Sequence, residues 1–357
     1  MDAGIQSIDY KGNKVNAIGG NGSSTSQINF RGTEDLGSGL KAEFRVETDW
    51  NVVSNKANTG DVAGSAASSF ANGEIRVGLA SNTFGRVDLG AVNYNTLTTF
   101  TTGQPFGTAI GSGFRAVTLN DVQGVVGLNA QNQGVYKGMG ASSVRSDNAI
   151  KYTSPSFYGF SGSLYFANKQ ANAVGNNFSS TLGAYDMQGT KELGLGYANG
   201  PLAVSFSSLK QDYEGLAMNG AGSVVNAINA TVNTLGANYA FGPAKVYGLY
   251  QNTKMDGGSG AGKLDYWALS GTYNLGSSVV LMASYGELKD KTDGASKDKA
   301  KLFALGADYN LSKRTALYAR YEDIKDGMGA IVISSTAFAS TSSDKRTRTA
   351  IGVRHAF

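Results

Sequence analysis

Cysteine is absent from the 357-residue sequence, and histidine occurs once, at position 355. The lack of cysteine excludes disulfides, thiolate metal ligands and a cysteine nucleophile. With a single histidine, a metal site or a catalytic triad would have to use His355, which the strand pattern near the chain end places beside lipid. We therefore predict no enzymatic activity, no cofactor and no bound metal.

Charged residues are also scarce, at 16% of the chain, and no apolar run approaches the roughly 18 residues of a membrane-spanning helix. Only 4 prolines accompany 49 glycines, which excludes a disordered Pro/Gly-rich chain. The net charge is +4, without the dense basic block that nucleic acid requires, so we expect no nucleic-acid partner. Abundant glycine, 18 tyrosines and moderate charge are typical of a membrane β-barrel, whose strands face lipid on one side and water on the other.

The dominant pattern is alternation of apolar and polar residues. Residues 40–47, LKAEFRVE, place four apolar side chains on one face of an extended strand and four charged ones on the other. A helix cannot use this pattern, because a period of two spreads around its 3.6-residue turn. We identify sixteen such strands, an even number as in bacterial barrels: 2–10, 25–33, 39–50, 70–80, 85–94, 146–154, 157–167, 188–198, 201–211, 231–241, 243–253, 263–274, 278–288, 299–310, 314–324 and 345–357.

The connections between these strands alternate in length. Short turns such as 81–84, 154–156 and 241–243 are followed by long polar segments such as 168–187 and 325–344. Outer-membrane barrels have short periplasmic turns and long extracellular loops. The longest connection, 95–144, is expected to fold into the lumen and narrow it, because structureless loops of this length are usually functional. The fold class predicted is all-β: one transmembrane antiparallel barrel domain, residues 1–357, with a constriction loop at 95–144.

Two sequence features near the ends of the chain have simple interpretations. The last strand carries Thr349, Ile351, Val353, His355 and Phe357 on its outward face, with the terminal ring at the membrane interface. The start already reads as a strand, so we expect that any export signal has been removed.

The segment GGSGAGKL (257–264) approximates a phosphate-binding loop. However, Leu264 stands where Ser or Thr would bind magnesium, and a strand follows where a helix is needed. We interpret it as a hairpin loop.

Several stretches resemble the trimeric general-diffusion porins of Gram-negative outer membranes, most closely the β-proteobacterial and neisserial type. They are FRGTEDLGSGLKAEFRVET (30–48), FGRVDLG (84–90), SDNAIKYTSPSFYGFSGSLYF (146–166) and AIGVRHAF (350–357), in the expected order. The resemblance implies a sixteen-stranded homotrimeric barrel in the outer membrane, with the third loop folded into the pore. It implies that Phe357 is part of the signal read by the barrel-assembly machinery, and that QPFG, with Pro105, Phe106 and Gly107, lies at the loop tip.

The resemblance also implies a cluster of arginines facing the loop, which this chain matches only in part. Gln27 and Gly73 occupy positions where relatives commonly have arginine, and Arg145 fits the pattern. Asp121 is the only acidic residue between 95 and 144. Arg76 is ambiguous: alternation with Ile75, Val77 and Leu79 places it inward, whereas the resemblance places it outward, in a subunit contact with Glu74.

The alternation predicts that basic residues outnumber acidic ones in the lumen, so we predict weak to moderate anion preference for small hydrophilic solutes and ions. The predicted pore residues are Gln27, Lys41, Arg45, Arg76, Arg86, Arg115, Asp121, Arg145, Lys151, Arg320 and Arg348. A substrate-selective channel, which needs aromatics along the lumen, and a pore-less adhesin are the alternatives. Outer-membrane lipid would surround the barrel. The segment 289–298, which carries both lysines and aspartates, is interpreted as an exposed loop, and it is also a candidate contact for lipopolysaccharide phosphates or divalent ions.

Overall fold

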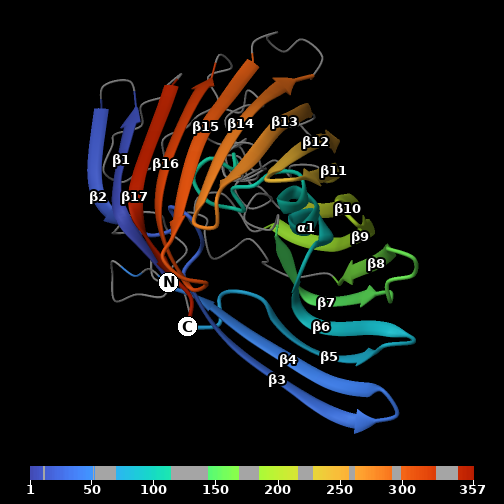
Figure 1. Cartoon of the computed structure of the whole chain (residues 1–357). Coiled ribbons are helices and arrows are strands. Elements are labelled where there is room, and N and C mark those ends of the chain that lie inside the picture. The colour runs from blue at the N-terminus through green and yellow to red at the C-terminus, as the bar shows by residue number, and fades with distance from the viewer. Residues whose placement is uncertain are drawn as a thin grey trace.

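The computed structural model describes residues 1–10, 13–50, 52, 70–113, 144–168, 185–215, 228–256, 262–291, 299–326 and 345–357. They contain seventeen strands of a single sheet and one short helix (Figure 1). The helix is α1 (Asn95–Thr102). The strands are β1 (Asp2–Tyr10), β2 (Asn13–Gly19), β3 (Gln27–Gly37), β4 (Leu40–Asp49), β5 (Ile75–Ser81), β6 (Gly85–Asn93), β7 (Arg145–Thr153), β8 (Phe160–Ala167), β9 (Tyr185–Asn199), β10 (Leu202–Gly215), β11 (Ile228–Phe241), β12 (Ala244–Asp256), β13 (Gly262–Leu275), β14 (Val279–Asp290), β15 (Lys299–Asn310), β16 (Thr315–Asp326) and β17 (Lys345–His355).

Every strand pair is antiparallel, and sequence neighbours pair from β3 to β17. The first strand then joins the last, with Ile5 opposite Ile351, and its other edge pairs with β2, where Ile5 lies opposite Ile18. The sheet therefore wraps around an interior, in which Figure 1 shows α1. No helix among the described residues is long and apolar enough to cross a membrane.

Each of the sixteen predicted strands corresponds to a strand of the structure, and β2 is the addition. Because all pairs are antiparallel, β2 and β3 run in the same direction, and residues 20–26 connect them. They are two parts of one crossing of the barrel wall, so the chain crosses the wall sixteen times. The sequence missed β2 because NKVNAIG lacks a clean apolar alternation.

Hydrogen bonds close the barrel beside the connection between β2 and β3. The carboxylate of Asp2 accepts backbone N–H groups of Ser23 and Ser24 at 2.7 and 2.8 Å and the Tyr318 hydroxyl at 2.7 Å. The amide of Asp2 donates to Ser26 Oγ at 2.8 Å. Since Tyr318 is on β16, the one carboxylate of Asp2 links β1, the connection 20–26 and β16.

The two faces of the sheet differ as the alternation predicts. Large apolar residues are exposed on the outward face, for example Leu269 at 63% and Val77 at 57%. The inward face contacts α1 and buries small polar side chains such as Ser205 and Ser207. A water-soluble sheet would bury the apolar face instead, so this inversion is the pattern of a barrel in lipid.

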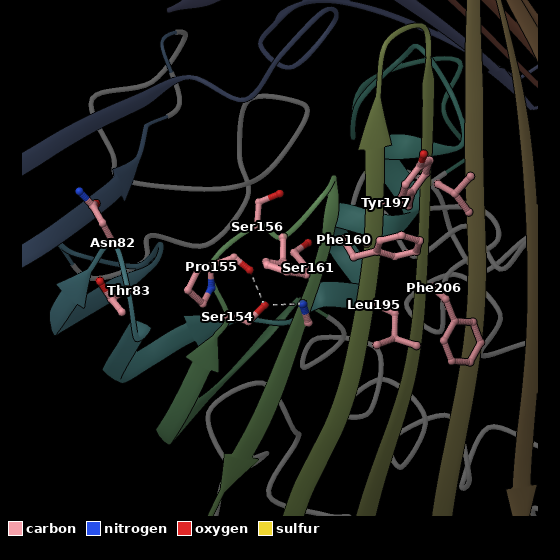
Figure 2. A pocket seen from close by; sticks show the side chains of 14 residues that line it. Asn82, Thr83, Ser154, Pro155, Ser156, Phe160, Ser161, Leu195, Tyr197 and Phe206 are labelled. Atoms are coloured by element: carbon pink, nitrogen blue, oxygen red, sulfur yellow. Dashed lines mark hydrogen bonds between the residues drawn. The ribbon is translucent and has the colours of Figure 1, made fainter.

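One end of the barrel has the short turns and the other has the long connections; we call them the short-turn end and the long-loop end. Four tyrosines near the short turns are exposed, as in the aromatic belts of membrane barrels: Tyr158, Tyr239, Tyr273 and Tyr309. A groove of about 780 Å³ lies at this end. Figure 2 shows the side chains that line it, among them Phe160, Leu195 and Phe206. Because Phe160 and Leu195 are 62% and 49% exposed on the outward face, this groove belongs to the lipid-facing band and not to the lumen.

Candidate functional site

A group of ionised side chains covers the inward face of β4–β7. We call it the wall cluster: Lys41, Glu43, Arg45, Glu47, Glu74, Arg76, Arg86, Asp88, Arg145 and Lys151. It contains six basic and four acidic residues. The strand registers place Arg45 directly opposite Arg76, and Asp88 directly opposite Lys151.

The acidic members of the wall cluster bridge its arginines. Arg45 pairs with Glu47 and, at 2.6 Å, with Glu74. The guanidinium groups of Arg76 and Arg86 both reach the fully buried Asp88 at 2.7 Å. Two arginines opposite each other would repel, so these bridges stabilise an otherwise unfavourable pair. Arg76 therefore lies on the inward face, as its strand alternation predicts.

The remaining predicted wall residues lie around this centre. Arg145 donates to the backbone oxygen of Asn72, and its charge acts on Glu47. Lys151 Nζ donates to the backbone oxygen of Asn93 at 2.9 Å. Gln27 shares a strand face with Asn29, whose side chain accepts from Arg45 Nε at 2.9 Å. A Cβ at Gly73 would clash with the side chain of Glu47, so this site has no room for an arginine.

The start of the long connection is fixed to the opposite part of the wall. Helix α1 lies against β9–β12, and its first amides, at Asn95 and Thr96, donate to the carboxylate of Glu192 on β9. A carboxylate is favourable there because it meets the positive end of the helix dipole and its unpaired N–H groups. Thr99 Oγ1 and Ser205 Oγ lie 2.7 Å apart, and Asn238 donates to Thr102 O at 2.8 Å.

Glycines of the wall allow the helix to come this close. A Cβ at Gly236 of β11 would clash with the backbone oxygen of Thr99 and lie 2.9 Å from the Gly103 nitrogen. Any larger residue at this position would occupy the seat of α1. The sequence shows the glycine, but only the tertiary contact shows why it is there.

The segment after α1 continues along the inner wall to β14–β17. Phe106 is 3% exposed and packs against Met282, Leu302 and Ile324. Gln104 fixes the turn, accepting from the Phe106 amide at 2.7 Å and donating to Gly107 O at 2.5 Å. Thus the described part of the loop, residues 95–113, is folded into the barrel as predicted, with Phe106 turned to the wall.

Glu322 of β16 holds the next turn of the loop. This fully buried carboxylate accepts from the Gly111 amide at 3.0 Å and from Arg348 Nε at 2.8 Å, and Arg346 lies at 3.4 Å. We call Arg320, Glu322, Arg346 and Arg348 the loop seat. Arg320 pairs with Asp308 at 2.7 Å, and its guanidinium carbon lies 5.9 Å from the centre of the Phe106 ring.

Two of the predicted pore residues belong to the loop seat and are buried. Arg320 and Arg348 lie on the inward face but are only 6% and 7% exposed, because the loop covers them. Arg115 and Asp121 lie outside the described residues. Sequence reasoning did not single out Glu192, although a lone acid on the inward phase of KELGLGYAN, beside glycines, could have indicated a contact with another segment.

A lipid-facing antiparallel barrel with an inward-folded third long connection and a charged inner wall defines the class of outer-membrane channel barrels. A sequence profile described as "Gram-negative porin" matches residues 1–327. The chain belongs to this porin family and is an outer-membrane β-barrel protein.

Individual relatives agree with this assignment. Outer membrane porin protein 32 of Delftia acidovorans is 31% identical over 69% of this chain, and an outer membrane porin protein of Bordetella pertussis is 32% identical over 64%. These matches span 60% and 52% of the two relatives' lengths. A solved anion-selective porin from Comamonas acidovorans aligns with all of this chain and 97% of its own, at 28% identity and a TM-score of 0.75. OmpT of Vibrio cholerae, at 17% identity and a TM-score of 0.65, supports the fold alone.

Proposed function

We propose that the protein is a passive channel for small hydrophilic solutes and ions, with a preference for anions, and that it works as a homotrimer. The observation that carries the proposal is the wall cluster, with six basic and four acidic side chains on the inward face of β4–β7. Charges on a wall surrounded by lipid act strongly on passing ions, because field lines are focused through the water. The structurally similar porin from Comamonas acidovorans is described as anion-selective, which supports the sign of the preference.

The pore residues fall into two groups under this proposal. Gln27, Lys41, Arg45, Arg76, Arg86, Arg145 and Lys151 act on passing ions at the wall. Arg320 and Arg348 act through the loop, because they are covered by it and hold Phe106 and Glu322 in place. Pro105, Phe106 and Gly107 then set the position of the constriction.

The substitution Arg145→Glu tests the role of the wall cluster. It replaces a positive charge by a negative one near Glu47, so the anion preference should fall. In a tenfold KCl gradient, an ideal anion channel reverses at about 59 mV in magnitude. We expect the reversal potential of the variant, measured in planar bilayers, to lie closer to zero than that of the wild type. Equal potentials would place the selective constriction elsewhere.

Removal of Phe357 tests the predicted contact with the barrel-assembly machinery. The terminal ring is 92% exposed, and its ring contact is with His355, so it adds little to the stability of the barrel. We expect the truncated chain to lose most of its outer-membrane trimer in cells, measured on unheated gels, but to refold in detergent. Phe357→Tyr should retain assembly. Normal amounts of the truncated trimer in cells would rule out a recognition role.

A substrate-selective channel is the second candidate, and the inner aromatic residues argue against it. Such a channel needs aromatic faces open to the solute. Four inward tyrosines of the described ranges, Tyr94, Tyr165, Tyr266 and Tyr318, are at most 3% exposed and pack behind the lumen surface. Tyr247 of β12, opposite Asn238 and Ser270 on the inward face, is partly exposed, but a single ring is not the row of aromatics that such a channel needs. The exposed aromatic residues of the short-turn end lie on the outward face instead.

A further inference from the structure

A lysine and a tyrosine lie together on the inward face of β12, outside both the wall cluster and the loop seat. Lys245 Nζ is 5.1 Å from the centre of the Tyr247 ring. The strand registers place Tyr247 between Asn238 of β11 and Ser270 of β13, and they place Lys245 opposite Thr272. We call these five residues the β12 site. It combines a cation, an aromatic ring and a polar surround.

The β12 site lies next to the end of helix α1, on its short-turn side. Helix α1 contacts both β11 and β12 (Figure 1). The side chain of Asn238 donates to Thr102 O at 2.8 Å, and a Cβ at Gly103 would clash with Leu249 of β12. Tyr247 has the same strand phase as Leu249 but is two residues closer to the short turn. A solute that passes the start of the constriction loop therefore meets this ring and its lysine.

The ammonium group of Lys245 is available to an anionic solute. Within the described ranges it is the one basic group on the inward faces of β11–β13, and no described acidic side chain forms an ion pair with it. In the wall cluster, by contrast, Arg76 and Arg86 share the carboxylate of Asp88 at 2.7 Å. An ammonium group has three donors, so Lys245 can bind an anion without first breaking an ion pair.

The ring of Tyr247 is also accessible. It is half-buried, whereas the other inward tyrosines described above are covered almost completely. A second aromatic ring can pack against it, offset or edge to face, at centroid distances of about 4.5–7 Å. The ammonium group of Lys245 is held beside this ring by their cation–π contact. In benzoate the carboxylate is attached directly to the ring, so an anion bound at Lys245 brings its own ring to Tyr247.

We propose that the β12 site binds aromatic carboxylates, with the carboxylate on Lys245 Nζ and the ring against Tyr247. An inorganic anion would use the lysine alone, and an aliphatic acid would gain no contact between aromatic rings. One charge-assisted hydrogen bond and one ring contact retain a solute briefly without closing the pore. The proposal rests on the channel function proposed above and adds a preferred class of solute to a passive pore.

The test is the reduction of chloride current by benzoate in planar bilayers. Cyclohexanecarboxylate, which has the same charge but no aromatic ring, is the reference and should be needed at a higher concentration for half-block of the wild type. Lys245→Gln should raise the half-blocking concentration of benzoate about tenfold, because a hydrogen bond to a charged group is lost. Tyr247→Leu should raise it about fivefold and leave the value for cyclohexanecarboxylate unchanged. Tyr247→Phe keeps the ring and should behave as the wild type.

Two matched variants control for the loss of a ring and of a charge. Tyr239→Leu removes a tyrosine of the same end of the barrel that is exposed on the outward face, and Lys313→Gln removes a lysine exposed in the turn between β15 and β16. Both should keep the half-blocking concentration of the wild type. The proposal is overturned if the two acids block the wild type equally, or if either control variant changes the block as much as its counterpart in the β12 site.

Binding measured without current separates this proposal from the channel function. In saturation-transfer NMR, the refolded wild type in detergent should transfer magnetisation to the ring protons of benzoate, and Tyr247→Leu should transfer less. A wild type that shows this transfer but does not conduct chloride would contradict the channel proposal and leave the β12 site intact. A wild type that conducts chloride but shows no transfer to benzoate would refute the β12 site and leave the channel function intact.

Discussion

Replacement of Glu322 by alanine is expected to increase anion preference and to weaken the folded barrel. The carboxylate is fully buried, and it compensates Arg346 and Arg348 while accepting the Gly111 amide. Its loss leaves two guanidinium groups without this acid and removes an anchor of the loop. Breaking a buried ion pair in this way costs about 3–5 kcal/mol. The reversal potential should move toward the ideal anion value, and the trimer should unfold at a lower temperature on gels.

Two controls separate charge from anchoring in this prediction. Glu322→Gln removes the charge but keeps an oxygen that can accept from the Gly111 amide. It should therefore shift the ion selectivity without adding noise to the open-channel current. Glu34→Ala removes an acid that is exposed near a short turn, and it should change neither property. If Glu322→Ala matched Glu34→Ala in both selectivity and heat resistance, the loop seat would have no role.

Substitution of Gly236 by valine is expected to displace α1 toward the lumen and to lower single-channel conductance. The new side chain would occupy the space of the Thr99 carbonyl and of Gly103, so the helix must leave the wall. Because Thr96 and Thr99 are hydrogen-bonded to the same region, displacement also breaks polar contacts that are buried. Single-channel recording measures both the lower conductance and the added current noise that a loosened loop would cause.

Gly271→Val provides the matched comparison for Gly236→Val. It is also a strand glycine, on the outward face of β13 next to Leu269, and the nearest atom to its Cβ would be 3.7 Å away. Valine suits a strand and has room there, so conductance should remain that of the wild type. Equal conductance of the two variants would show that α1 does not rest on Gly236 in the membrane.

Strand positions and facing could be predicted from the sequence for physical reasons that are local. In a strand, successive side chains point to opposite faces, so a lipid-facing and a water-facing side leave a period of two in the sequence. Sixteen strands, the short and long connections, and the inward phase of Arg45, Arg76 and Asp88 followed from that period alone. The strand β2 escaped because it is short and interrupted, and its place depends on bonds between Asp2 and residues 22–26.

The sequence by itself determined the class of protein, the outward and inward faces, and the excess of basic residues on the inner wall. Only the tertiary structure decided which charges remain open to the lumen. Arg320 and Arg348 have the same phase as the wall residues, yet the loop covers them through Phe106 and Gly111. Such a contact joins residues far apart in the chain, Gly111 and Glu322 being separated by 211 positions. No local pattern encodes this pairing, because it depends on which parts of the wall the closed sheet brings to the loop.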